Sequence, residues 1–518
     1  MASYALVGVV VLLLLVALAD RLQTAHTIKR NFPLIGRFRY WLEAAGGPVR
    51  QYIVAGNDEE RPFTRDQRRW VYASAKRENN YFGFGTDNDL ELASGYPIVR
   101  HAAFPHDAPA PGQPGYDPQY VIPCAKVLGG ARGRKHAFRP TSIVNTSAMS
   151  YGSLSSAAVE AINRGVKIAG ALQNTGEGGI SEFHRKGGDL VWQIGTGYFG
   201  CRDARGNFSL ERFLETVASA PVRAVEIKLS QGAKPGLGGV LPAAKITPEI
   251  ARIRLIQLGQ DCISPSAHSA FRDVSSLLDF IERLADATGL PVGIKSAVGE
   301  IGFWTELARQ IDTTGRGPDF ITIDGGEGGT GAAPLVFTDH VSLPFKLGFS
   351  TVYREFAERG VKEKIVFIGS GKLGFPAQSL LALGLGCDLI NVAREALLAI
   401  GCIQTQLCHT GHCPTGIATQ DRWLVGGLDP TSKSARLANY LVTLRKDILA
   451  LAHACGEVHP ALVTLEHIDL IDGLQRRGAR EFFNYAPGWG LPGTDDVRAI
   501  REVMAARVAE LAARPAAH

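Results

Sequence analysis

Three cysteines lie close together in a chain that contains only eight. Cys402, Cys408 and Cys413 are spaced C-x5-C-x4-C. Thiolates are soft ligands that bind iron–sulfur clusters or zinc, and three of them without a fourth nearby cysteine favour a three-iron cluster, 3Fe-4S. A structural zinc site needs a fourth ligand, which His409 or His412 would supply, and it usually contains C-x2-C. We therefore expect an iron–sulfur cluster here, with zinc as the alternative.

The three cysteines follow the last of eight short apolar runs between residues 142 and 393. These runs are SIVNTS, ALQNT, VWQIG, AVEIKL, PVGIKSA, DFITID, KIVFIGS and CDLINVA. Each precedes a helical stretch, which is typical of parallel strands buried on both faces. Eight such units predict a closed (β/α)8 TIM barrel, whose chemistry takes place on loops at the carboxyl ends of the strands. An open doubly wound sheet is the alternative, but no G-x-G-x-x-G opens a helix after the first run.

Glycine-rich or polar residues end the predicted strands. The turn GSGK (369–372) follows the seventh run, and turns after strands seven and eight form a standard phosphate site in such barrels. Taken alone, GSGK would indicate only a tight turn. A phosphate at this point, with amides and lysines around the barrel mouth, indicates FMN, because a nearby lysine can stabilise charge on a reduced flavin. The candidate cofactor-binding residues from this pattern are Ser147, Ala148, Met149, Ser150, Asn174, Asp324, Thr330, Gly369, Gly371, Ala393 and Arg394.

The first 19 residues carry no charged side chain, which is a length that can cross a hydrocarbon core of about 30 Å. No positive segment precedes them and no cleavage site follows, which argues against a cleaved signal peptide. Arg and Lys residues follow from Arg21 onward, so the positive-inside rule predicts a cytoplasmic body. We expect a single-pass protein of the inner (cytoplasmic) membrane with its catalytic domain in the cytoplasm. The alternative is an apolar helix docked on the rest of the protein.

Composition and charge argue against a nucleic-acid-binding protein and against a disulfide-linked one. The chain has 518 residues with 45% hydrophobic and 20% charged content, which is ordinary for a folded protein, and its net charge of +5 gives little support to nucleic-acid binding. The five cysteines outside the cluster are scattered singly, which indicates reduced thiols rather than disulfides. The predicted organisation is an anchor (1–20), an N-terminal cap region (21–135), the barrel with its cysteine loop (136–421) and a helical C-terminal extension (422–518).

Five motifs between residues 143 and 421 together resemble one enzyme family. They are SAMSYGSLS, NTGEGG, EIKLSQGAKPGLGG, GGTGAAP, and C-x5-C-x4-C followed by PTGIATQD. The chain is similar in these motifs to the FMN-binding synthase domain of glutamate synthases. That domain is a (β/α)8 barrel with FMN and a 3Fe-4S cluster, and it reduces 2-iminoglutarate, formed from 2-oxoglutarate and ammonia, to L-glutamate.

The resemblance also implies residue roles. It implies that Cys402, Cys408 and Cys413 are the cluster ligands. It adds FMN contacts at Gln193, Lys228, Lys295, Gly328, Gly329 and Gly331. It places 2-oxoglutarate on Gln231, Lys234 and Arg254, which with Lys228 form the predicted catalytic set. A dicarboxylate requires cations, and arginine can bind a carboxylate through two parallel hydrogen bonds.

The chain departs from the family pattern near the expected substrate pocket. Leu237 stands where the family typically has an acidic residue, and the segment around His268 lacks a second histidine. No amidotransferase segment precedes the barrel, so we expect ammonia or an amine from solution or another subunit. No NAD(P)H-binding fingerprint is present either. We therefore expect an external electron donor protein, either ferredoxin-like or a flavoprotein.

Three functions stay open on this evidence. The first is a reductase that makes glutamate or a related amino acid from a 2-oxo acid and an amine. The second is a membrane-linked flavin and iron–sulfur amino-acid dehydrogenase that passes electrons to a membrane carrier. The third is a non-catalytic subunit that relays electrons, against which the presence of Lys234 and Arg254 argues.

Overall fold

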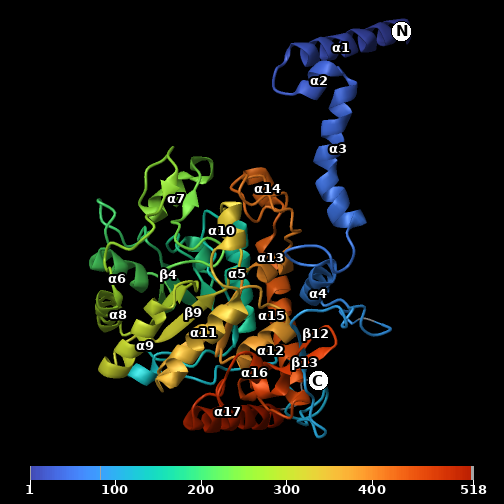
Figure 1. Ribbon diagram of the computed structural model, residues 1–518. Coiled ribbons are helices and arrows are strands. Elements are labelled where there is room, and N and C mark those ends of the chain that lie inside the picture. The colour runs from blue at the N-terminus through green and yellow to red at the C-terminus, as the bar shows by residue number, and fades with distance from the viewer. Residues whose placement is uncertain (1, 82, 515–518) are drawn as a thin grey trace. The chain divides into compact units, whose positions relative to one another are not determined.

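The computed structural model describes residues 2–81 and 83–514, which divide into two compact units between Arg69 and Trp70. The first unit contains three helices and a π-helical turn, and α4 (Arg65–Lys76) crosses the division. The elements of the first unit are α1 (Ala2–Leu22), α2 (Thr27–Asn31), α3 (Ile35–Val49) and the turn η1 (Arg50–Val54). The second unit holds a barrel surrounded by helices (Figure 1).

Eight parallel strands close into a barrel in the order β10-β11-β2-β3-β4-β5-β8-β9. All eight predicted strands are confirmed, and the closed barrel replaces the alternative of an open sheet. The strands are β2 (Val144–Thr146), β3 (Gln173–Asn174), β4 (Leu190–Ile194), β5 (Val222–Lys228), β8 (Val292–Ser296), β9 (Phe320–Asp324), β10 (Val366–Ser370) and β11 (Leu389–Val392). Nearly every residue in these strands is buried, as expected for strands covered on both faces.

Helices surround the barrel, and several begin with side-chain caps. Ser155 accepts the Ala158 N–H at the start of α5, and Asp273 forms a capping box with Ser276 at the start of α8. The surrounding helices are α5 (Ser156–Ala169), α6 (Leu210–Ala218), α8 (Val274–Thr288), α9 (Gly302–Thr314), α11 (Phe345–Glu358), α12 (Pro376–Gly384) and α13 (Arg394–Ala399).

Insertions gather at the end of the barrel where the strands finish. One insertion after β5 contains β6 (Val240–Leu241), α7 (Pro248–Arg254) and β7 (Cys262–Ile263), and another after β9 contains α10 (Leu335–His340). Figure 1 shows α7, α10 and α14 (Arg422–Gly426) at this end and α17 (Thr494–Ala512) at the opposite end. The inserted segments therefore enclose the end that carries the predicted site.

The C-terminal region is helical in part. Helix α15 (Pro430–Ala454) packs against α5, and α16 (Ala479–Phe482) and α17 follow later in the chain. In the chain, a hairpin of β12 (Ile468–Asp472) and β13 (Gln475–Gly478) lies between α15 and α16. The hairpin pairs with β1 (Tyr96–Val99) to form a three-stranded sheet. The expectation of a mostly helical extension missed this hairpin, because β13 is polar and largely exposed and lacks an apolar alternation.

Helix α1 is long and apolar enough to cross a membrane by length and composition, with a mean hydropathy of 2.5 over Ser3–Leu22. Its apolar side chains are uncovered, and Leu12 for example is 61% exposed. A signal sequence near an N-terminus, or the core helix of a soluble protein, has the same length and composition. The membrane anchor is therefore a proposal.

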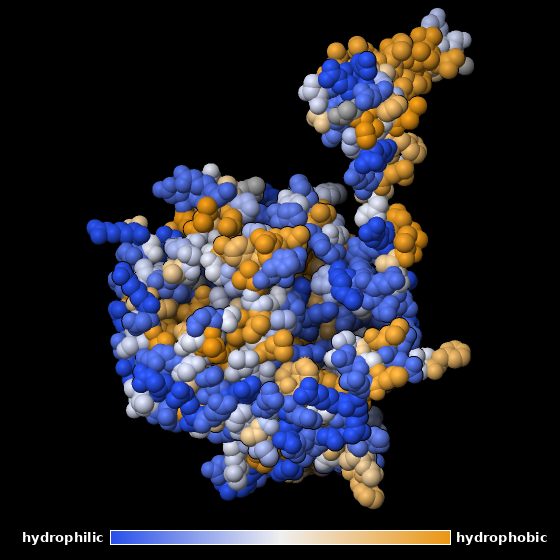
Figure 2. Space-filling model, viewed as in Figure 1, coloured by the Kyte–Doolittle hydropathy of each residue, from blue (hydrophilic) through white to orange (hydrophobic). Residues whose placement is uncertain are grey.

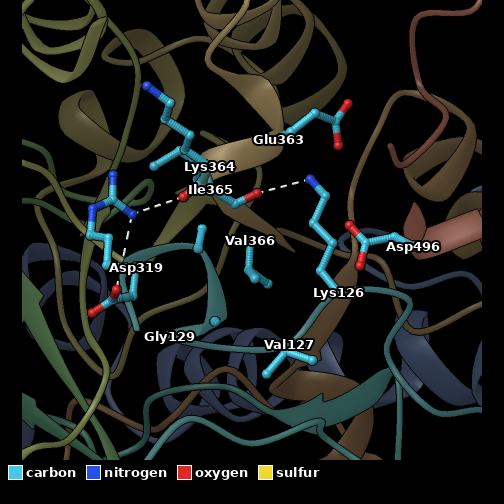
Figure 3. Close-up of a pocket in the computed structure, with 12 residues that line it drawn as sticks. Lys126, Val127, Gly129, Asp319, Glu363, Lys364, Ile365, Val366 and Asp496 are labelled. Carbon is cyan, nitrogen blue, oxygen red and sulfur yellow. Dashed lines mark hydrogen bonds and ion pairs between the residues drawn. The ribbon is translucent and has the colours of Figure 1, made fainter. Parts of the chain in front are cut away.

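A cavity of about 330 Å³ lies at the amino ends of β9 and β10, opposite the predicted site. Figure 3 shows Lys126 reaching across it to the Ile365 carbonyl, at 2.9 Å. The Lys126 ammonium also lies 3.2 Å from the Asp388 carboxylate, and both side chains are almost fully buried. This end of a (β/α)8 barrel usually serves stability, and here the N-terminal segment is fastened to it by a paired charge.

Replacing Lys126 with Met tests this fastening. The substitution leaves the Asp388 carboxylate buried without its cation, so we expect a loss of about 3–5 kcal/mol in the free energy of unfolding. Denaturant unfolding measures the loss. The double variant Lys126→Met with Asp388→Asn removes the stranded charge and should recover part of the stability. Equal stability of wild type and Lys126→Met would contradict the interpretation.

Candidate active site

Side chains at the carboxyl ends of the strands converge on one buried layer. Because successive side chains alternate between the faces of a strand, every second residue points into the barrel. Asp324 of β9 lies 3.5 Å from the Lys295 ammonium of β8 and accepts the Gly232 N–H at 2.9 Å. Across the mouth, the Ser147 and Ser370 hydroxyls are 3.3 Å apart. The carboxyl ends of β2, β8, β9 and β10 therefore lie around one space.

A buried carboxylate that the sequence analysis missed organises the layer beneath. Glu226 of β5 is 1% exposed and accepts hydrogen bonds from Asn174 at 2.8 Å, Gln193 at 2.6 Å and Thr322 at 2.6 Å. The amide N–H groups of Asn174 and Gln193, two predicted FMN contacts, are therefore directed at this carboxylate. A charged residue inside the apolar run AVEIKL was the available sequence signal, because charges are rarely buried without partners.

Two glycine-rich loops approach each other over the strand ends. The Arg394 guanidinium donates to the Glu327 carbonyl, and a Cβ on Gly329 would lie 2.5 Å from Arg394 Cδ. Gly371 has φ of 126°, a conformation that side chains disfavour. By contrast, a Cβ on Gly369 would lie 3.0 Å from the Phe345 ring, so a helix side chain already fills the space beside Gly369.

The other predicted cofactor residues lie on the same rim. Ala148, Met149 and Ser150 continue from β2, Thr330 and Gly331 lie in the loop after β9 with Gly328, and Ala393 precedes α13. A Cβ on Gly331 would meet no atom closer than 4.0 Å, so open space adjoins this loop. Cations at Lys295 and Arg394, close backbone and open space together fit a phosphate-bearing planar cofactor such as FMN.

Next to this rim, a cation cluster surrounds a second carboxylate that the sequence analysis missed, Glu177. The Lys228 ammonium lies 2.8 Å from Glu177 and 3.2 Å from the Gln231 side-chain oxygen. Gln231 in turn donates to the Gly329 carbonyl at 2.8 Å. Burial opposes ionisation of Glu177, but the three nearby cations hold its pKa below its ordinary value. The motif NTGEGG contains Glu177, and a carboxylate between glycines at a strand end was the signal to follow.

Lys234 and Arg254 complete this cluster, and both are buried. Lys234 is 8% exposed and Arg254 is 5% exposed. Within residues 2–81 and 83–514, no carboxylate pairs with the Lys234 ammonium, and the Arg254 Nε–H has no acceptor. Burial lowers the pKa of each below its ordinary value. Together with Lys228 and Glu177, these two side chains form a largely buried group of three cations and one carboxylate. The group therefore carries a net charge of plus two.

Arg254 is held in place by its neighbours. Its Nη2 donates to the Tyr151 carbonyl at 3.0 Å, and its guanidinium lies 5.1 Å from the Phe199 ring centroid. A Cβ on either Gly152 or Gly178 would come within 3.1 Å of that nitrogen, so both glycines make room for it. The motifs SAMSYGS and NTGEGG therefore flank the guanidinium.

His268 lies beneath the cluster in its neutral form. Its Nε2–H donates to the Lys228 carbonyl at 2.8 Å, and its Nδ1 is 3.1 Å from the Tyr198 hydroxyl. Burial lowers the pKa of His268 to about 4, so the ring adds no further positive charge near neutral pH. Leu237 lies on the neighbouring loop, where its side chain is 38% exposed.

The cysteine loop follows the eighth barrel strand, β11, as predicted, with α13 between them, but its thiols do not converge as one ligand set. Burial and, to a smaller extent, the neighbouring Cys413 thiol raise the pKa of Cys408. Lys245 donates to the Cys408 carbonyl at 2.7 Å, and the Tyr72 hydroxyl donates to the Cys402 carbonyl at 2.7 Å. In the part of the chain that the structure describes, no three His, Cys, Asp or Glu side chains converge as a metal site. The thiol chemistry fits an iron–sulfur cluster, although the three side chains do not converge in this structure.

The neutral state of His268 predicts a pH dependence of stability. The unfolded chain protonates this histidine near pH 6.5, whereas the folded chain does so only near pH 4, so stability falls as the pH drops through that window. We expect His268 to account for a loss of about 2 kcal/mol between pH 7 and pH 5. Denaturant unfolding of wild type and His268→Gln across this range measures the difference. Identical pH slopes would contradict it.

Comparisons with known proteins identify the family of this chain. A protein family described as a conserved region in glutamate synthase matches residues 132–458. The glutamate synthase large subunit-like protein YerD of Bacillus subtilis is 37% identical over 488 residues, which cover 89% of this chain and 92% of that protein. The archaeal glutamate synthase (NADPH) of Methanocaldococcus jannaschii is 35% identical over 309 residues. That match covers 60% of this chain and 58% of the relative, so this chain spans less than two thirds of the archaeal protein.

Among solved structures, a flavocytochrome b2 variant with pyruvate bound has a TM-score of 0.42 and 13% identity, covering 84% of this chain and 85% of the other. That similarity is too low to add to the barrel seen directly in the strand order. The sequence matches carry the assignment, since one spans most of both proteins. This chain is an oxidoreductase that belongs to the glutamate synthase family.

Proposed function

We propose that this protein reduces 2-iminoglutarate, formed from 2-oxoglutarate and ammonia or an amine, to L-glutamate or a related amino acid. One observation carries the proposal: Lys234 and Arg254 are buried cations beside the barrel mouth without carboxylates of their own. Desolvated charges of this kind are costly unless a counter-ion joins them. A dicarboxylate of charge minus two matches the excess of two positive charges.

The side chains divide the work of binding. Lys234 binds one substrate carboxylate as a compact charge, and Arg254, already oriented by Tyr151 and Phe199, binds the other. Glu177 keeps Lys228 fixed at the end of β5, which leaves Lys234 and Arg254 for the substrate. Their burial strengthens each interaction and excludes water from the reacting carbon.

FMN is the cofactor that we propose for the mouth, held by the loops after β9 and β10 with Lys295 and Arg394. FMN that has been reduced by the external electron donor would supply a hydride to the substrate C2, and the imine nitrogen would take up a proton, so that C=N becomes an amine. The chain's own residues contribute position: they hold C2 over the flavin site and fix its orientation.

Reduced flavin in the full-length protein tests the direction of reaction. After anaerobic photoreduction, adding 2-oxoglutarate with ammonium should reoxidise the flavin and yield glutamate.

Lys234→Ala should weaken 2-oxoglutarate binding about 10- to 100-fold, because a charged hydrogen bond contributes roughly 1.5–3 kcal/mol, while the bound-flavin spectrum stays unchanged. Lys135→Ala, an exposed lysine near Gly289 at the other end of the barrel, is the matched control.

The same preparation tests the alternative of a membrane-linked amino-acid dehydrogenase, which the exposed apolar helix α1 favours. An amino acid that bleaches the oxidised flavin, while 2-oxoglutarate and ammonium fail to reoxidise the reduced form, would establish the dehydrogenase. Unchanged 2-oxoglutarate affinity in Lys234→Ala would remove Lys234 from the site.

We also propose that Cys402, Cys408 and Cys413 come together on a 3Fe-4S cluster that receives electrons from an external ferredoxin-like protein or flavoprotein. Three thiols on one loop after α13 support this. Anaerobically purified protein should contain about three irons per chain and a paramagnetic signal when oxidised. Cys413→Ser should lose iron while FMN remains. Stoichiometric zinc without iron would contradict the cluster.

The anchor and its location complete the proposal. We infer that α1 crosses the inner membrane once, with both catalytic and cysteine segments in the cytoplasm. The uncharged stretch before Asp20 and the basic residues that follow it support this orientation.

A further inference from the structure

Helix α3 carries an apolar stripe that no other described residue of the first unit covers. Ile35, Phe38, Leu42 and Val49 recur every three to seven residues, which places them on one face of the helix. All four are exposed, from 44% at Val49 to 79% at Ile35. Figure 2 shows this segment hydrophobic along one side and hydrophilic along the other. An uncovered stripe of this length marks an interaction surface.

The stripe begins where the apolar helix α1 ends. The Arg37 Nε lies 2.8 Å from a carboxylate oxygen of Asp20, which is 1% exposed, and the same carboxylate accepts the Leu34 N–H at 3.1 Å. This ion pair fixes the first turn of α3 beside the last turn of α1. Figure 1 shows the two helices running in clearly different directions from this corner. If α1 crosses a bilayer, α3 starts at its surface and runs along it.

Charge around the stripe selects the kind of surface. Residues 21–56 contain six Lys or Arg and a single acidic residue, Glu43. Basic residues beside a membrane span are attracted to anionic headgroups, each by about 1 kcal/mol near the surface. Phe38 and Trp41, whose rings are 5.7 Å apart, are of the type that collects at the membrane–water boundary.

The helix also needs an external surface to be stable. Its second half contains Gly46, Gly47 and Pro48, which are poor helix formers, and isolated helices of about this length are marginal in water. A stripe that lies on a surface supplies the missing stabilisation. A second copy of the chain is the other possible cover, since the apolar spacing resembles a coiled-coil seam. The shared excess of positive charge would make two copies repel, whereas it attracts anionic lipid.

We propose that α3 lies in the interface of an anionic lipid bilayer, with its stripe (Ile35, Phe38, Leu42 and Val49) facing the acyl chains. This inference rests on the proposed anchor α1. Unit 1 then holds the membrane through two elements, one across it and one along it, joined at the Asp20–Arg37 ion pair. Single-pass anchoring alone would leave the stripe in water.

Trp41 reports the position of α3 in the full-length protein. The protein is placed in nanodiscs of phosphatidylcholine and phosphatidylglycerol at one chain per disc, and the emission of Trp41 is obtained by subtracting the Trp41→Phe spectrum. We expect lipids brominated on the acyl chains to quench this component, aqueous acrylamide to quench it weakly, and omission of phosphatidylglycerol to reduce the bromolipid effect. Trp423, which is 88% exposed in the second unit, provides the control for solvent access through Trp423→Phe: its component should respond strongly to acrylamide.

Each other outcome overturns a defined part. A Trp41 component that responds to acrylamide and not to bromolipid would overturn the interfacial position of α3, while retention of the protein after alkaline carbonate extraction would keep the anchor. Release of the protein by carbonate would overturn the anchor itself. Shielding of Trp41 that requires two chains per disc and no bromolipid contact would assign the stripe to a second copy.

Discussion

Closure of eight parallel strands constrains the rest of the second unit, because it brings every carboxyl end to one rim. The ring closes where β11 pairs with β2, with Ile390 opposite Val144. Once closed, the barrel has no edge, and loops of very different length must share the space above it. Residues far apart in sequence, such as Glu177 and His268, become neighbours of Lys228 for this reason.

The two ends of the barrel handle charge differently, and this difference separates stability from function. At the amino end, Lys126 and Asp388 form a closed pair beside backbone carbonyls, so the buried charges cancel. At the carboxyl end, Glu177 offsets only one of three cations. The remaining imbalance is costly in a desolvated site, and the proposed anionic substrate would relieve it. A fold can retain such an imbalance where binding compensates for it.

In the first unit, one ion pair sets the geometry. Asp20 is a carboxylate near the end of α1, whose only other charged residue is Arg21, and Arg37 neutralises Asp20 from the start of α3. The pair therefore fixes the corner between the two helices, and the direction of α3 follows from it. The proposed interfacial position of the apolar stripe depends on that direction, because in the proposed membrane the same helix continuing in line with α1 would present its basic residues to hydrocarbon.

The sequence by itself determined the barrel, because each of the eight apolar runs is a local pattern that needs no knowledge of its neighbours. It also determined the rim residues, since strand ends are local features. Tertiary structure alone decided the partners: Glu226 accepts hydrogen bonds from three other strands, and Glu177, after β3, lies among cations of β5 and of the insertion that follows it. The sheet that contains β13 was likewise completed by tertiary structure, because its partner β12 pairs with β1 from the N-terminal part of the chain. Pairing and distance depend on chain segments far apart in sequence, and residue spacing does not encode them.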